Sequence, residues 1–243
     1  MLRYRELLTA DNQANRTKPQ EPEASGIVVC NFGSQLDIKG LDGRYKGTVH
    51  RCHKKATLDT VVAGDRVIWQ HGDPYGIVLS REARTSKIVR PDTYGKIRTV
   101  AANIDRIAIV FACIPKPSSQ LIDRYLVAAE TQNIQPVLIV NKIDEDYHFK
   151  PVTQKLVRNY ADIGYRVVLV SAKTGEGIKE LKKCLCNCTS IFVGQSGVGK
   201  SSLINHLHPE AHAAVSELSR GNQKGVHTTT TSRLYDLSFG GQL

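Results

Sequence analysis

The sequence has no hydrophobic run long enough to cross a membrane. A membrane-spanning helix needs roughly 18 or more consecutive apolar residues, and the longest apolar segments, Pro136–Val140 and Val167–Val170, have the length of a strand. The first six residues, Met-Leu-Arg-Tyr-Arg-Glu, also lack the apolar core of a secretory signal peptide. We therefore expect a cytoplasmic protein with no membrane partner.

The sequence also lacks the cysteine patterns of a disulfide framework or a zinc site. Six cysteines are present, and a cytoplasmic chain is not expected to pair them. Cys184, Cys186 and Cys188 alternate, which differs from the paired Cys-x-x-Cys spacing of structural zinc sites. A second group of His and Cys at residues 50–53 is short and isolated. Neither group predicts a metal site.

Acidic residues are in the minority. The chain has 33 Lys and Arg against 23 Asp and Glu, a net charge of +10. Such an excess can serve solubility alone. It also favours a polyanionic partner, because each phosphate that a basic side chain neutralises releases counterions. In a chain long enough for two domains, we favour nucleic acid as that partner.

The distribution of apolar residues predicts two domains. Residues 1–22 are polar and predict a flexible tail. Residues 23–90 hold short apolar segments separated by Gly turns, which predicts a small all-β domain, and a five-stranded OB-type barrel fits this length. Residues 91–100 are interpreted as a linker. From residue 101 to 243, apolar strands alternate with amphipathic stretches, which predicts a doubly wound α/β domain with a parallel sheet. The expected barrel strands are Gly26–Val29, Tyr45–His50, Asp65–Trp69 and Gly76–Leu79.

Basic residues gather around one connection of the predicted barrel. They are Arg44, Lys46, Arg51, Lys54 and Lys55. OB-type barrels commonly bind oligonucleotides, so these residues are candidates for binding RNA. A solvated charged loop explains the same residues equally well.

A complete phosphate-loop motif, Gly-x-x-x-x-Gly-Lys-Ser, lies between a predicted strand, Ser190–Val193, and a predicted helix from Lys200. Glycines allow backbone N–H groups to surround phosphates, and the helix N-terminus adds a favourable dipole. Lys200 is expected to reach the β- and γ-phosphates, and the Ser201 hydroxyl to bind Mg²⁺. The predicted phosphate-binding residues are Gly194, Gln195, Ser196, Gly197, Val198, Gly199, Lys200, Ser201 and Ser202.

A guanine-reading motif follows the predicted strand Pro136–Val140. It consists of Asn141, Lys142, Ile143 and Asp144. The Asp144 carboxylate can accept hydrogen bonds from the ring N–H and exocyclic amine of guanine, and adenine has no such donor pair. Each bond to a charged acceptor contributes roughly 1.5–3 kcal/mol. A phosphate-loop ATPase or kinase is therefore disfavoured.

A third motif, Ser171-Ala172-Lys173, follows the next predicted strand. The Ala172 N–H is expected to meet the guanine carbonyl oxygen. Open α/β sheets bind ligands at the carboxyl ends of their strands, where all three motifs fall. In ordinary Ras-like GTPases the phosphate loop precedes the guanine motifs, whereas here it follows them. The sequence therefore predicts a circularly permuted Ras-like GTPase domain.

Residues 219–231 are rich in Gly, polar and basic residues, and predict a mobile first switch. A threonine in this stretch is expected to complete the Mg²⁺ shell, and the residues alone do not identify which one. His227 is a candidate for orienting the attacking water, and an exposed loop histidine is an equally good interpretation.

These motifs, in this order behind a small β domain, closely resemble the family of ribosome small-subunit-dependent GTPase A (RsgA, also called YjeQ or EngC). The segments Ala101–Asp105 and Gly64–Val67 are also similar to that family, and the resemblance begins near residue 24. It implies a monomeric GTPase that binds the 30S subunit and its 16S rRNA and assists late maturation and release of assembly factors. It also implies Thr229 as the Mg²⁺-binding switch threonine and His227 as a catalytic residue beside Lys200.

The resemblance also implies more chain than Leu243. The family continues into an Asp-x-Pro-Gly second switch, whose strand lies between Ser190–Val193 and a strand near Leu234–Leu237, and then into a zinc-binding domain. We therefore expect the natural protein to be longer, with Zn²⁺ bound only in that further domain. A second hypothesis is a GTP-regulated RNA-binding module that does not hydrolyse its nucleotide, and the intact Lys200 and Ser201 favour the enzyme.

Overall fold

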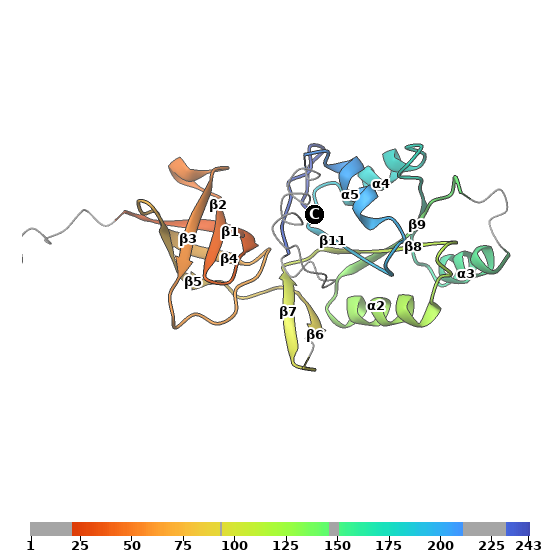
Figure 1. Ribbon diagram of the computed structural model, residues 1–243, viewed down its shortest axis with the longest axis horizontal. Coiled ribbons are helices and arrows are strands. Elements are labelled where there is room, and N and C mark those ends of the chain that lie inside the picture. Colours follow the sequence, from red (N-terminus) through yellow and green to blue (C-terminus); the bar gives the residue numbers. More distant parts are fainter. Residues whose placement is uncertain (1–20, 93, 146–150, 211–231) are drawn as a thin grey trace, which may run out of the picture.

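The computed structural model describes residues 21–92, 94–145, 151–210 and 232–243. Most of the predicted N-terminal tail, 1–22, lies outside these residues. Figure 1 shows a small barrel beside a larger part in which helices cover a sheet, with a β-hairpin, β6 and β7, between them. None of the helices in the described part of the chain has both the length and the apolar character needed to span a bilayer.

The N-terminal part is a closed five-stranded barrel, as predicted. Its strands close in the order β1-β2-β3-β5-β4, with β4 pairing back onto β1. A 3₁₀ turn, η1 (Gly43–Tyr45), leads into β3, so the strand expected from residue 45 begins later. The strands are β1 (Glu23–Asn31), β2 (Gln35–Gly40), β3 (Val49–Lys54), β4 (Arg66–Gln70) and β5 (Gly76–Arg81).

Strand β2 is absent from the predicted set because a carboxylate interrupts its apolar pattern. Asp37 is buried in the middle of the strand. On the neighbouring strand, Arg51 donates from Nε to Asp37 Oδ1 at 2.5 Å. The ion pair compensates the buried charge, while Leu36 and Ile38 of the same strand are fully buried in the barrel core.

A β-hairpin occupies the stretch interpreted as a linker, residues 91–100. Strands β6 (Lys87–Pro91) and β7 (Ile97–Ala102) pair antiparallel. The Asp92 carboxylate accepts hydrogen bonds from the N–H groups of Tyr94 and Lys96, both at 2.9 Å, and so closes the connecting turn. The polar residues of this stretch form the turn of a hairpin, whereas from the sequence they were interpreted as an extended connection.

The C-terminal part is a doubly wound parallel sheet, as predicted. The strand order is β10-β9-β8-β11, and every neighbouring pair is parallel. Helices α2 and α3 cover one face and α4 and α5 the other (Figure 1). The strands are β8 (Arg106–Ala112), β9 (Gln135–Asn141), β10 (Val167–Leu169) and β11 (Ser190–Val193). The helices are α2 (Ser119–Thr131), α3 (Pro151–Asp162), α4 (Ile178–Leu185) and α5 (Lys200–Leu207).

Residues 232–243 connect the sheet with the barrel. Gln242 forms a parallel bridge with Thr189, next to β11, and an antiparallel bridge with Asp236. On the barrel side, the Leu234 N–H donates to the carbonyl of Val29 at 2.8 Å. The segment near Leu234–Leu237, expected as a strand, is therefore held by isolated bridges, and Gln242 lies between it and the end of the sheet.

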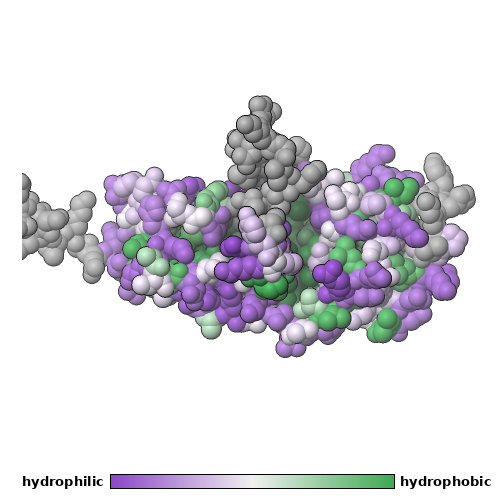
Figure 2. All heavy atoms as spheres, turned by 60° about the horizontal axis from the view of Figure 1, so that its bottom comes forward, coloured by the Kyte–Doolittle hydropathy of each residue, from purple (hydrophilic) through white to green (hydrophobic). Residues whose placement is uncertain are grey.

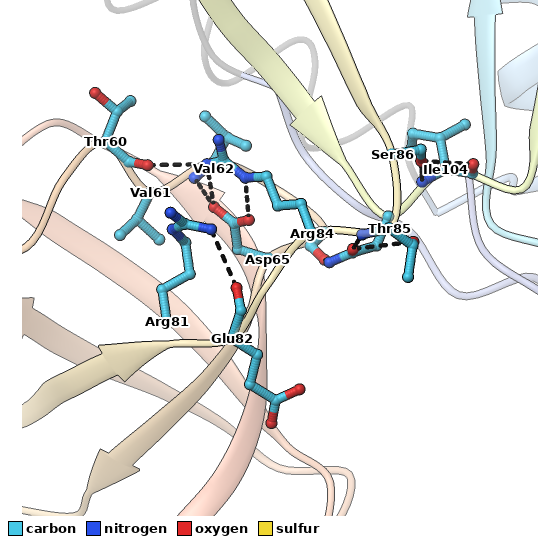
Figure 3. Close-up of polar contacts among 12 residues, drawn as sticks. Thr60, Val61, Val62, Asp65, Arg81, Glu82, Arg84, Thr85, Ser86 and Ile104 are labelled. Atoms are coloured by element: carbon cyan, nitrogen blue, oxygen red, sulfur yellow. Dashed lines mark hydrogen bonds and ion pairs between the residues drawn. The ribbon is translucent and has the colours of Figure 1, made fainter. Parts of the chain in front are cut away.

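A buried ion pair fixes the junction between the barrel and the hairpin (Figure 3). Asp65 is fully buried, and Arg84 donates to its two carboxylate oxygens at 2.7 and 2.8 Å. The same carboxylate accepts from the Val62 N–H at 2.7 Å. Next to the pair, Gly64 has φ +87°, and a Cβ there would lie 2.2 Å from the Ala102 carbonyl oxygen. The loop before β4 is thus packed tightly against the end of β7.

Replacing Asp65 with alanine is expected to lower the free energy of unfolding by about 3–5 kcal/mol, because the largely buried Arg84 guanidinium would lose its counter-ion. Urea denaturation followed by circular dichroism measures the change. The control is Glu180→Ala, which removes an ion pair with Arg166 in which both side chains are about half exposed, and the free energy of unfolding should change far less because solvent screens that pair. Equal losses in the two variants would contradict a structural role for the buried pair.

Candidate functional site

The phosphate loop connects β11 to α5, as the motif predicts. Its glycines Gly194, Gly197 and Gly199 all have positive φ, between +81° and +141°. At Gly199 a Cβ would lie 2.3 Å from the Asn141 Nδ2 atom, so a side chain there would displace the guanine motif. The loop is therefore a backbone cradle at the N-terminus of α5, where the helix dipole favours an anion.

Lys200, the first residue of α5, points back into this loop. Its ammonium group donates to the carbonyl oxygens of Gly194 at 3.0 Å and Gln195 at 2.6 Å. Burial of the side chain lowers the pKa of Lys200, because desolvation disfavours its charged form. Phosphate oxygens at this position would stabilise the ammonium form.

Asn141 joins the three motifs. It is the last residue of β9 and is buried. Its Nδ2 donates to the Val198 carbonyl in the phosphate loop at 2.9 Å, and its Oδ1 accepts from the Ala172 N–H at 3.2 Å. Asn141 therefore braces the phosphate loop against the guanine motif. The Ala172 N–H is directed at Asn141, and its expected contact with a guanine carbonyl stays a prediction.

Asp144 is oriented by Ser171, which is fully buried. The Ser171 hydroxyl donates to Asp144 Oδ1 at 2.5 Å and accepts from the N–H groups of Lys173 and Thr174. The hydrogen bond from Ser171 is the main reason that the pKa of Asp144 lies below its ordinary value, with the charges of Lys173 and Lys142 adding to it. Asp144 is therefore an ionised acceptor held in one orientation, and Ser171 is a positioning residue.

A cavity of about 160 Å³ brings the motifs together. Asp144 lies on one wall, and Gly199 and Ser202, at the start of α5, lie on another. Glu145, which sequence reasoning did not include, also lines it and lies 3.5 Å from the Lys142 ammonium. The only feature of the sequence that could have indicated a role for Glu145 is its position directly after the guanine motif. The full lining is Asn141, Lys142, Asp144, Glu145, Ala172, Lys173, Gly199 and Ser202.

The remaining predicted residues, Lys200 among them, do not line this cavity or lie outside the described chain. The Ile143 N–H donates to the Val170 carbonyl at 3.3 Å, and Gln195 Oε1 accepts from the Ser118 N–H at 3.3 Å. Ser196 and Ser201 are exposed in the loop and at the start of α5. His227 and Thr229 lie outside the described residues.

A larger hollow of about 470 Å³ lies away from these motifs. Arg106 and Gln135, the first residues of β8 and β9, line it. It is therefore at the amino ends of the strands, whereas Asn141 and the phosphate loop are at their carboxyl ends. The smaller cavity is the one that fits the ligand geometry of open α/β sheets.

The basic residues predicted for the barrel do not form one continuous row. Arg44 belongs to η1 and pairs with Glu21, and Lys46 follows η1 directly. Arg51 belongs to β3 and lies 4.6 Å over the Phe32 ring. Lys54 donates to the Leu58 carbonyl, and Lys55 is exposed directly after β3. The five residues thus lie at separate places on the barrel, and Arg51 stands beside the half-exposed Phe32 ring.

Comparison with known families matches residues 81–243 to the RsgA GTPase family. The chain belongs to this family. It is 47% identical over 224 residues to the small ribosomal subunit biogenesis GTPase RsgA of Ectopseudomonas mendocina and 46% identical to that of Pseudomonas fluorescens. Each match covers 91% of this chain and 65% of the relative, so the chain spans about two thirds of the length of these RsgA proteins.

Solved structures of similar proteins agree with this placement. YjeQ from Thermotoga maritima superposes with a TM-score of 0.68 at 28% identity, covering 91% of this chain and 73% of that protein. YloQ, described as a circularly permuted GTPase, superposes with a TM-score of 0.61 at 27% identity, covering 81% and 68%. The permuted order of the RsgA family and the OB-type barrel are thus both confirmed for this chain.

Proposed function

We propose that this chain binds GTP and GDP and hydrolyses GTP in the cavity between Asp144 and the phosphate loop. The observation that supports the proposal is the lining of that cavity, to which Asp144 contributes together with Gly199 and Ser202 at the start of α5. An ionised Asp144 selects guanine over adenine because its oxygens need two N–H donors on the same edge of the base. The Ser171 hydroxyl binds Asp144 Oδ1, and the Lys173 ammonium lies 3.8 Å from Oδ2, so a base would approach Oδ2 beside Lys173.

The residues present fit a Mg²⁺-nucleotide. A Cβ on Gly199 would collide with Asn141, so the loop needs glycine at this position. The backbone N–H groups of the loop would bind the phosphates, and Lys200 would supply the positive charge. The Ser201 hydroxyl would hold Mg²⁺ together with Thr229 of the switch stretch. The metal ion, when bound, neutralises charge on the β- and γ-phosphates. Lys200 would orient the phosphates, and His227 would orient the attacking water.

We also propose the small ribosomal subunit and its 16S rRNA as the partner in the cytoplasm, with the chain acting as a monomer in late subunit maturation. The net charge of +10 supports a polyanionic partner. The basic residues on the barrel, Arg44, Lys46, Arg51, Lys54 and Lys55, support contact with RNA, and Phe32 offers a ring for base stacking. We propose no Zn²⁺ site among the described residues, in which no three His, Cys, Asp or Glu side chains gather.

The deciding experiment measures phosphate release from GTP and from ATP, each with and without purified 30S subunits. We expect the chain to hydrolyse GTP and not ATP, poorly by itself and faster in the presence of the subunits. Co-sedimentation with 30S in a non-hydrolysable GTP analogue and in GDP tests the partner separately. GTP-dependent co-sedimentation without phosphate release would instead support the hydrolysis-deficient RNA-binding module.

Replacing Ser171 with alanine is expected to weaken GTP binding about tenfold, because Asp144 loses the hydrogen bond that orients it. Titration of a fluorescent guanine nucleotide measures the affinity, and the ratio of GTP to ATP affinity should fall with it. Ser190→Ala is the matched control: Ser190, the first residue of β11, is also a buried serine, and its hydroxyl has no hydrogen-bond partner in the described part of the chain. A loss of fold with an unchanged nucleotide ratio would argue for a purely structural role of Ser171.

A further inference from the structure

A groove runs between the hairpin strand β6 and helix α2, on the side of the molecule opposite α4 and α5. It has a volume of about 370 Å³. Its apolar lining includes Ile88 from β6, Ile107 from β8, and Leu121 and Tyr125 from α2. Figure 2 turns this side forward and shows hydrophobic patches within a mainly hydrophilic surface. Val89, in the same strand, is 46% exposed, which is high for a valine in a sheet.

The groove also contains an open strand edge. Strand β6 pairs with β7 on one side, and no other strand of the described residues pairs with its second side. In an antiparallel pair alternate residues direct their backbone N–H and C=O groups away from the partner strand. Part of the backbone of Lys87–Pro91 is thus available to another extended chain, in the manner of β-strand addition.

The rim of the groove carries positive charge only. Lys87 and Arg90 lie on β6 and Arg124 on α2, and all three are exposed. No Asp or Glu lines the groove. Two copies of this basic hairpin would repel each other, so the edge is protected against pairing with a second copy while it stays attractive to an acidic segment.

We propose that this groove binds an extended acidic and apolar peptide segment of a partner protein as a third strand beside β6. Apolar side chains of the segment would enter the space over Ile88, Leu121 and Tyr125, and its carboxylates would meet Arg90 and Arg124. An RNA strand would satisfy the basic rim, but it would leave the apolar floor and the backbone edge of β6 without partners, so the peptide is the better fit.

The test titrates the full chain, without nucleotide, with a labelled peptide that alternates glutamate with valine and spans all five residues of β6. We expect saturable binding with amide shifts in β6 by NMR. A peptide with lysine in place of glutamate, and one with N-methylated amides on the pairing edge, should both bind at least about tenfold more weakly. Equal binding of the N-methylated peptide would overturn strand addition.

Three variants locate the site. The double variant Arg90→Glu/Arg124→Glu reverses the rim charge, and Ala128→Trp fills the groove from an exposed position on α2. Each should weaken peptide binding at least about tenfold, whereas Arg158→Glu, an exposed arginine on α3, should leave it unchanged. The proposal fails if the groove variants bind the peptide normally, if a single-stranded RNA displaces it from the wild type, or if sedimentation shows that the groove holds a second copy of the chain.

Discussion

Replacing Lys200 with alanine is expected to lower the affinity of the chain for GTP by about 100-fold, or roughly 2.7 kcal/mol, and to reduce phosphate release at least as strongly. The Lys200 ammonium lies inside the phosphate loop, bound to the carbonyls of Gly194 and Gln195. In this half-buried setting a charge-assisted bond to phosphate is stronger than in water. The variant also leaves those two carbonyls without the donor that now satisfies them.

The loss should depend on the phosphates and not on the base. GTP, GDP and GMP titrations on Lys200→Ala separate the two, because a contact to the β- and γ-phosphates cannot weaken GMP binding. The control is Lys179→Ala, which removes an exposed lysine from α4 and so changes the net charge equally. If GMP binding falls as much as GTP binding, Lys200 supports the fold of the loop and does not contact the terminal phosphates.

The sequence was sufficient to predict that the three motifs lie at one edge of the sheet, because each motif is local. Each motif follows a strand of a parallel sheet, and the carboxyl ends of such strands meet at one edge. Asn141, Asp144 and Gly199 therefore reach the same cavity although the phosphate loop follows the guanine motif in the chain. What local patterns did not contain is the contact between two motifs: Ser171, which is predicted to bind GTP, donates its hydroxyl to Asp144 Oδ1.

The same reasoning was insufficient where structure depends on distant partners. Strand β2 contains Asp37, whose burial makes sense only when Arg51 of β3 is beside it. Residues 91–100 were interpreted as a linker, and they form the turn and most of the second strand of a hairpin whose strands β6 and β7 pair with each other. In both cases the stabilising contact is between strands, and no single segment carries it.

Replacing Asp144 with asparagine is expected to lower the affinity for GTP by about 100-fold and to raise the affinity for XTP above it. A carboxylate accepts from both the ring N–H and the exocyclic amine of guanine, and two such bonds contribute roughly 3 kcal/mol or more. An asparagine amide offers one acceptor and one donor. Xanthine has a carbonyl where guanine has its amine, so the amide donor finds a partner in XTP and an opposing donor in GTP.

Glu145→Gln is the matched control for this exchange. Glu145 lines the same cavity and follows Asp144 in the chain, so the variant removes the same charge from the same place. Its carboxylate pairs with Lys142 and has no bond to Ser171.

If the preference for guanine arises from the general negative charge of the cavity, both variants should lose it to a similar degree. If it arises from the two oxygens that Ser171 orients, Glu145→Gln should keep GTP far above XTP while Asp144→Asn reverses the order. Competition of GTP and XTP against one fluorescent guanine nucleotide distinguishes these results. If XTP binds more tightly than GTP only in Asp144→Asn, the permuted chain recognises guanine through the Asp144 carboxylate alone.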